Sequence, residues 1–163
     1  MTSPPAFCNT TDKDILSQVL NDYDLKTHDF FRWAISYTAN ELSQLLLRKT
    51  GIDFGTITDL IPMERGVSGR LIKLHITGTK KSIIIGKELE IRKALSPTHL
   101  YSSAIIIEKV RRNDEDIFNL YGAGWGHGVG LCQIGAAVMG ARGYAYKEIL
   151  LHYFPGAEVK RVY

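Results

Sequence analysis

The chain has 163 residues, of which 45% are hydrophobic and 23% are charged, and its formal net charge is +3 at pH 7. This size and composition are typical of one folded domain with its own core, and they exclude a largely disordered chain. The small positive charge is scattered along the sequence, which excludes the footprint of a nucleic-acid-binding protein, so no nucleic-acid partner is expected. No apolar run is long enough to cross a bilayer, and the N-terminal residues contain no apolar stretch like a signal peptide.

The first third of the sequence predicts a short helix, a strand and a longer helix. Asp12 is placed to cap the first helix, and a polar break over Asn21–Asp29 follows it. Apolar and polar residues alternate over Phe31–Tyr37, which is typical of a half-buried strand. Thr38 and Glu41 have the spacing of a capping box, so we expect a second helix to begin there and to end at the next glycine.

The middle of the sequence has mostly the pattern of short strands separated by turns. We expect one short helix there, over Lys87–Ala94, and a turn at Arg111–Glu115 that joins the last two strands. The strands are expected over Ile57–Met63, Leu71–Thr77, Ser82–Ile85, Ser103–Val110 and Asp116–Tyr121. This order of elements predicts an α+β fold with a mainly antiparallel, partly barrel-like sheet and short helices.

The last forty residues differ from the rest, because residues 122–143 contain eight of the fifteen glycines. Small residues fill Cys132–Arg142, which predicts a closely packed helix after a glycine-rich loop. A second, amphipathic helix is expected over Tyr146–Tyr153, with Ile149, Leu150 and Tyr153 facing inward. Ala157–Tyr163 is expected to form a final strand.

The segment Gly122–Ala137, GAGWGHGVGLCQIGAA, is the candidate functional site. Its first five glycines alternate with Ala123, Trp125, His127 and Val129. Because glycine has no Cβ, such a backbone can adopt positive φ and let another group come close. The first N–H groups of the following helix can donate to an anionic or carbonyl oxygen. The spacing matches neither the Walker A loop nor the dinucleotide fingerprint, so no nucleotide or other cofactor is expected.

The same residues also allow a purely structural interpretation. The glycines then permit tight packing of the Trp125 ring and the small-residue helix, and His127 is a neutral side chain bonded to backbone. Gln133 bonds locally at the start of its helix. In the functional interpretation an exposed Trp125 stacks on a sugar ring. The residues alone leave both interpretations open.

Read as a unit, the loop resembles the C-terminal signature of the SpoIID/LytB family, G-x-G-x-G-H-G-V-G-x-x-Q-x-G-A. The run Tyr146–Gly156 is similar to the family's continuation. Upstream, Ser68-Gly69-Arg70 resembles the family's S-G-R element. Arg92 with Leu95 resembles R-x-x-L, and Leu100–Ser103 resembles L-x-S. The matches extend from about residue 31 to residue 163.

The resemblance implies an extracytoplasmic domain that acts on peptidoglycan in cell-wall remodelling or sporulation. It implies either a lytic transglycosylase that processes peptide-stripped glycan strands, or a non-catalytic wall-binding module or enhancer of a cell-wall amidase. His127 is the supporting catalytic candidate. The residues expected to contact glycan are Trp125, His127, Gln133, Tyr121, Tyr146, Gly126 and Gly128.

One family element has no counterpart in this sequence, namely the G-E-M-P segment with its catalytic glutamate. We therefore expect a single domain over residues 1–163 that lacks this catalytic segment. Glycan cleavage needs a positioned carboxylic acid, and Glu64 and Glu88 are the acids to test. No zinc-ligand spacing is present, although a metal-dependent enzyme using His127 and Cys132 is a third hypothesis. Cys8 and Cys132 form either one disulfide or two separate thiols.

Overall fold

The computed structural model describes residues 6–19 and 31–161. The chain divides into two compact units. Arg32–His127 forms the first, here called the sheet unit. Met1–Phe31 together with Gly128–Tyr163 forms the second, here called the helical unit. The expectation of a single domain over residues 1–163 stays a prediction.

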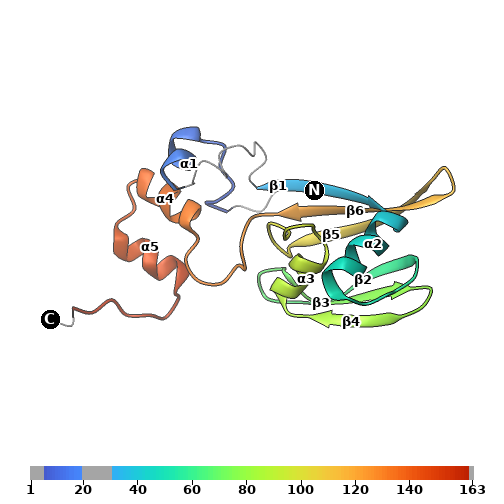
Figure 1. Cartoon of the computed structure of the whole chain (residues 1–163). Helices are drawn as coiled ribbons and strands as arrows, with labels where there is room; N and C mark the ends of the chain where they lie inside the picture. Colours follow the sequence, from blue (N-terminus) through green and yellow to red (C-terminus); the bar gives the residue numbers. More distant parts are fainter. Residues whose placement is uncertain (1–5, 20–30, 162–163) are drawn as a thin grey trace. The chain divides into compact units, whose positions relative to one another are not determined.

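The sheet unit contains two three-stranded antiparallel sheets and two helices (Figure 1). Sheet A has the order β1-β6-β5 and sheet B has the order β2-β3-β4. The elements are β1 (Arg32–Thr38), α2 (Ala39–Thr50), β2 (Ile57–Arg65), β3 (Leu71–Gly78), β4 (Ser82–Gly86), α3 (Glu88–Ala94), β5 (Ile105–Arg112) and β6 (Glu115–Ala123). The predicted α+β, antiparallel fold is confirmed. Both sheets are open, so the described strands close no barrel.

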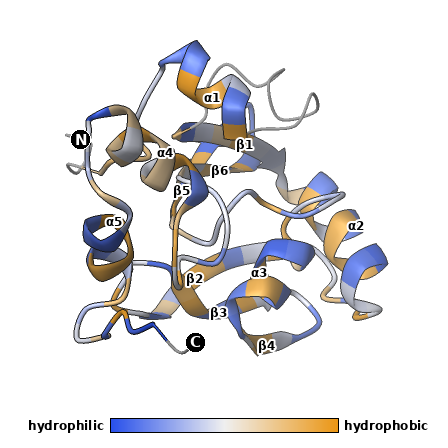
Figure 2. Cartoon of the chain, turned by 90° about the vertical axis from the view of Figure 1, so that its left-hand side faces the viewer, coloured by the Kyte–Doolittle hydropathy of each residue, from blue (hydrophilic) through white to orange (hydrophobic). Residues whose placement is uncertain are grey.

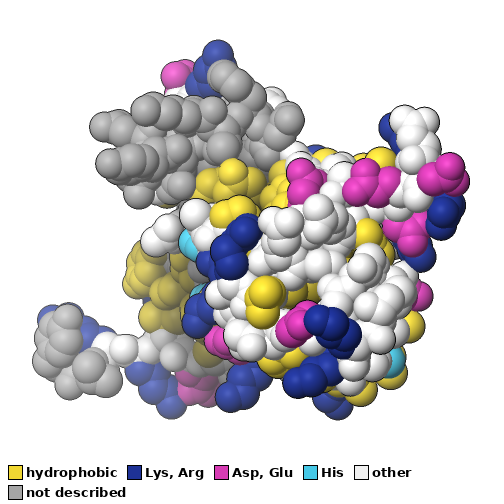
Figure 3. Space-filling view, turned by 45° about the vertical axis from the view of Figure 1, so that its right-hand side comes forward, with side chains coloured by type: hydrophobic (Ala, Val, Ile, Leu, Met, Phe, Trp, Pro, Cys, Tyr) yellow, Lys and Arg dark blue, Asp and Glu magenta, His cyan; other side chains and the backbone are white. Residues whose placement is uncertain are grey.

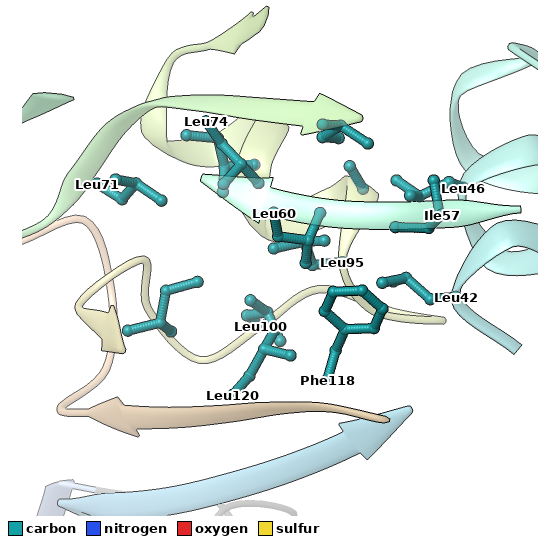
Figure 4. Close-up of a cluster of buried hydrophobic side chains, with 14 of the residues drawn as sticks. Leu42, Leu46, Ile57, Leu60, Leu71, Leu74, Leu95, Leu100, Phe118 and Leu120 are labelled. Carbon is teal, nitrogen blue, oxygen red and sulfur yellow. The ribbon is translucent and has the colours of Figure 1, made fainter. Parts of the chain in front are cut away.

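The core of the sheet unit lies between the two sheets and against α2 (Figure 4). Phe118 and Leu120 point into it from β6, and both are fully buried. The other labelled side chains come from α2, β2, β3 and the segment after α3: Leu42, Leu46, Ile57, Leu60, Leu71, Leu74, Leu95 and Leu100. Burial of these aliphatic groups is the main favourable term that holds the two sheets together.

Local signals set the ends of several elements. The Thr38 backbone N–H donates to Glu41 Oε2 at 2.8 Å, and the Glu41 N–H donates to Thr38 Oγ1 at 3.2 Å, so the predicted capping box is confirmed. Helix α2 ends at Gly51, whose φ is 71°. Between β5 and β6 the turn is shorter than predicted, because Asn113 and Asp114 adopt φ of 48° and 61° and the strands extend up to them.

The helical unit contains α1 (Lys13–Val19), α4 (Gln133–Ala141) and α5 (Tyr146–Tyr153). Asp12 caps α1 as predicted, since its Oδ1 accepts from the N–H groups of Asp14 and Ile15 at 3.0 and 3.2 Å. Helix α4 packs against both α1 and α5. Hydrophilic and hydrophobic residues both occur along α5 (Figure 2). Its predicted inward residues are half-buried: Ile149, Leu150 and Tyr153.

The predicted final strand over Ala157–Tyr163 is wrong for the described residues 157–161, which form no strand and are exposed. A β-strand needs a neighbouring strand to pair its backbone groups, and a short apolar pattern cannot supply one. The predicted polar break at Asn21–Asp29 lies outside the described residues. No helix in the described part of the chain is long and apolar enough to span a membrane.

Candidate functional site

The glycine-rich loop begins at the end of β6 and has an unusual backbone. Gly124 and Gly126 adopt φ of 67° and 75°, and Gly128 and Gly130 adopt 72° and 74°. Residues with a Cβ rarely adopt such angles, so every second position of this segment favours glycine. The prediction of positive φ in the loop is confirmed, and the strict two-residue spacing has a conformational cause.

Gly122, at the start of the loop, is glycine for a different reason. It is buried under the indole of Trp33 on the neighbouring strand β1, and an added Cβ would lie 2.0 Å from the Trp33 ring. Trp33 Nε1 also donates to the Gly124 carbonyl oxygen at 3.2 Å. The predicted close approach to a glycine therefore occurs at Gly122, and the approaching group is the Trp33 indole of the same chain.

A short segment before β5 supports the loop through its backbone. The Gly126 N–H donates to the Tyr101 carbonyl oxygen at 2.8 Å. Ser102 Oγ donates to the Ala123 carbonyl oxygen at 2.8 Å and accepts from the Ala104 N–H at 3.2 Å. Hydrogen bonds at Ala123 and Gly126 thus hold the loop close to this segment and fix its path.

Three aromatic rings lie together at the base of the loop. The Tyr101 ring stacks on Trp125 with centroids 4.3 Å apart and an interplanar angle of 8°. It meets Trp33 edge-to-face, at 5.7 Å and 86°. Trp125 is half-buried. The indole is thus neither an isolated surface ring nor a fully buried core residue, and its orientation is fixed by Tyr101.

Arg70 binds the other side of the loop backbone. Its Nε donates to the Gly126 carbonyl oxygen at 3.0 Å and its Nη2 to the Trp125 carbonyl oxygen at 3.4 Å. Arg70 follows the β2–β3 turn, in which the Gly69 N–H donates to the Gly66 carbonyl oxygen at 2.9 Å. The planar guanidinium can bind two adjacent carbonyl groups at once, which a lysine cannot do in the same way. This role explains the arginine of the Ser68-Gly69-Arg70 element.

Arg92 holds the supporting segment itself. It is buried, and its Nε donates to the Leu100 carbonyl oxygen at 2.7 Å. Its Nη1 pairs with Glu88 Oε1 at 3.1 Å, and the two side chains are only 10% and 16% exposed. The Arg92–Leu95 element therefore positions residues 100–104, which in turn position the loop.

The two acids that the sequence singled out are both ion-paired. Glu88 pairs with Arg92, and Glu64 Oε2 lies 2.5 Å from Lys73 Nζ. Their contacts are those of structural ion pairs.

The remaining side-chain candidates in the sheet unit are His127 and Tyr121. His127 is exposed and ends the unit. Tyr121 is 46% exposed, and its hydroxyl donates to Glu108 Oε2 at 3.4 Å. Because successive side chains of a strand point to opposite faces, Tyr121 lies on the face of sheet A opposite to Leu120 and Gly122. Tyr121 and Trp33 thus lie on opposite faces of the same sheet.

The other candidates belong to the helical unit. Gly128 and Gln133, the first residue of α4, are exposed, and Tyr146 at the start of α5 is 65% exposed. Cys132 caps α4, with its Sγ accepting from the Gly135 N–H at 3.5 Å. The predicted close packing of this small-residue helix is confirmed at Gly135, where an added Cβ would lie 2.0 Å from Tyr153 Oη.

Sequence comparison places these features in a family. A model described as "Domain of unknown function (DUF8618)" matches residues 1–130. The chain belongs to this family. The match covers the whole sheet unit and the four loop glycines with positive φ, and it ends before α4.

A segment of 67 residues of this DUF8618 chain, 41% of its length, is 33% identical to the amidase enhancer of Bacillus subtilis (strain 168). The match covers 9% of the amidase enhancer, so the chain spans only a small part of that curated relative. This partial similarity suggests a SpoIID/LytB-like relationship, in line with the motifs of the loop.

The surface charges of the DUF8618 chain are balanced locally. Acidic and basic side chains lie beside one another on the face drawn in Figure 3. In the β5–β6 hairpin, Asp116 pairs with Lys109 at 2.9 Å and with Arg111 at 3.6 Å.

Among the described residues, no three His, Cys, Asp or Glu side chains are grouped so that they could hold a metal ion.

Two neighbouring serines of the DUF8618 chain give a direct test of the loop's support. Ser102→Ala should lower the free energy of unfolding by about 1–3 kcal/mol, because the Ala123 carbonyl oxygen and the Ala104 N–H lose a buried partner. Ser103→Ala is the matched control. Ser103 Oγ is buried without a hydrogen-bond partner among the described residues, so this change should be neutral or slightly stabilising. Urea unfolding would contradict the assignment if both variants lost equal stability.

Proposed function

We propose that this chain binds peptidoglycan glycan strands through the part of the loop that belongs to the sheet unit, with Trp125, Gly126 and His127 as the contact residues. The main support is that this loop is bonded both to the Arg70 guanidinium and to the Tyr101 backbone, and that the exposed His127 follows the stacked Trp125 by two residues. The similarity to an amidase enhancer and the SpoIID/LytB-like signature direct the choice of ligand towards the cell wall.

The chemistry of the loop suits a carbohydrate. Sugars expose C–H groups that pack on aromatic surfaces and hydroxyls that exchange hydrogen bonds with imidazole. Glycine at alternate positions leaves no side chain projecting there, so a polymer can approach the loop backbone closely. A loop already held by hydrogen bonds loses little conformational entropy when it binds.

We propose binding without cleavage. Cutting a glycosidic bond requires a carboxylic acid beside the leaving oxygen. Glu64 and Glu88, the acids that the sequence singled out, are held in ion pairs with Lys73 and Arg92. In this proposal His127 binds a sugar hydroxyl. The other contact residues predicted from the sequence stay predictions: Gln133, Gly128, Tyr121 and Tyr146.

A wall-binding function requires an extracytoplasmic location, which is part of the proposal. The glycan strand is the ligand, and a cell-wall amidase is the second partner to consider. An enhancer role is favoured by the partial similarity to the amidase enhancer of Bacillus subtilis (strain 168). If the chain acts as an enhancer, it increases the rate at which a cell-wall amidase solubilises labelled walls, and binding alone leaves that rate unchanged.

Binding can be measured by titrating the full chain with purified, peptide-stripped glycan strands. Trp125→Ala and His127→Ala should each weaken binding about tenfold or more, because each removes a direct contact. His99→Ala, at another exposed histidine of the sheet unit, is the matched control and should bind like the wild type. Equal affinity of all four proteins would exclude this site, and release of anhydro-muramic ends by the wild type would show that the chain cuts.

A further inference from the structure

The N-terminal segment of the helical unit is held against α4 and α5 by one aromatic side chain. The Phe7 ring meets the rings of Tyr144 and His152 edge-to-face, at 5.7 and 5.3 Å. The Arg142 guanidinium lies 5.5 Å from the centre of the same ring. The next residue, Cys8, therefore has a position fixed by Phe7.

The second cysteine of the chain, Cys132, is the N-cap of α4. Cys132 Sγ accepts from the Gly135 N–H at 3.5 Å. A Cβ on Gly135 would lie 2.0 Å from Tyr153 Oη and 3.5 Å from Phe7 Cβ. Gly135 is thus in contact with Cys132 on one side and faces Phe7, the neighbour of Cys8, on another. Cys132 and the residue next to Cys8 therefore both lie at the first turn of α4.

Tyr153 also lies against the first turn of α4, because a Cβ on Gly135 would be 2.0 Å from its hydroxyl. Burial raises the pKa of Tyr153 to about 12, and the charges of Cys132 and Cys8 contribute in the same direction. Both cysteines are half-buried thiols here and are not joined by a disulfide.

We propose that Cys8 and Cys132 form an intramolecular disulfide when the chain is exposed to a disulfide oxidant. A thiolate of one cysteine attacks the oxidant's disulfide, and one oxidant thiol leaves. The second cysteine then attacks the mixed disulfide and releases the other oxidant thiol. The two cysteines lose two electrons and two protons, and the oxidant gains them. The bond ties the N-terminal segment to the residue that caps α4, directly after the glycine-rich loop.

The proposal is tested by equilibrating the full chain with oxidised and reduced glutathione, followed by acid quenching, denaturation and alkylation. We expect a monomer that is 2 Da lighter, with neither cysteine alkylated and with Cys8 and Cys132 peptides linked before reduction. The oxidised chain should melt roughly 5–15 °C higher than the reduced chain, because the cross-link restricts the unfolded state. Alkylation of both thiols, or separate glutathione adducts on each, would overturn the proposal.

Two single variants control for folding. Cys132→Ser keeps an atom that accepts from the Gly135 N–H, so α4 retains its cap. Cys8→Ser leaves Phe7 and its ring contacts in place. We expect both variants to fold and to melt at a temperature independent of the glutathione ratio. A redox-dependent melting temperature in either variant would contradict a bond between these two cysteines.

Discussion

Replacing Arg92 with methionine should lower the free energy of unfolding by about 3–5 kcal/mol, because removal of one partner leaves a buried charge uncompensated. The substitution keeps much of the aliphatic packing but removes the donor to the Leu100 carbonyl oxygen. It also leaves the Glu88 carboxylate, only 16% exposed, without its cation. Urea unfolding of the full chain, followed by tryptophan fluorescence, measures the loss.

The partner acid supplies the control for Arg92. Glu88→Gln removes the negative charge with little change of shape, so the double variant Arg92→Met/Glu88→Gln should recover part of the stability that Arg92→Met loses. A double-mutant cycle gives the coupling free energy between the two side chains. If the four stabilities are additive, the pair is not coupled and the assigned role of Arg92 is wrong.

Replacing Gly122 with alanine should cost about 3 kcal/mol of stability. The new methyl group would lie 2.0 Å from the Trp33 ring, so the indole must move, and Trp33 also holds the Gly124 carbonyl oxygen. We therefore expect a change in tryptophan fluorescence of the folded protein together with the lower denaturation midpoint. Glycan affinity should fall in parallel, since the loop starts at this residue.

Gly86→Ala is the matched control for Gly122→Ala. Gly86 also lies at the end of a strand of the sheet unit, and its added Cβ would meet only the Ile72 carbonyl oxygen, at an ordinary 3.8 Å. Its stability should stay within about 0.5 kcal/mol of the wild type. Similar losses in the two variants would show that strand ends in general, and not the Trp33 contact, limit stability.

Local sequence patterns were enough to locate most elements. The capping box at Thr38 and Glu41 and the αL glycine at 51 depend on residues within a few positions of one another. The alternation in β1 reflects the two-residue period of a strand, which can be recognised from the residues of that strand alone. These signals are carried by neighbours in the chain, so no knowledge of the fold is needed to interpret them.

Two predicted features were wrong because they depend on residues that are distant in the sequence. The strand expected over Ala157–Tyr163 had the correct local pattern over its described part, but a strand exists only with a partner. Closure of the sheets into a barrel depends on how distant strands pair, and β1-β6-β5 and β2-β3-β4 instead form two open sheets. Neither outcome can be decided from residues that are adjacent in sequence.

The sequence by itself determined that the loop backbone can adopt positive φ, because residues without a Cβ enter this region without strain, and Gly124 and Gly126 do so. Only the tertiary structure decided what holds that loop. Arg70 reaches the Gly126 carbonyl oxygen across 56 residues, and Trp33 reaches Gly124 across 91. Contacts over such separations arise from strand pairing and core packing, which bring distant segments together. The glycines therefore permit this loop conformation locally, and the long-range contacts of the sheet unit hold it in place.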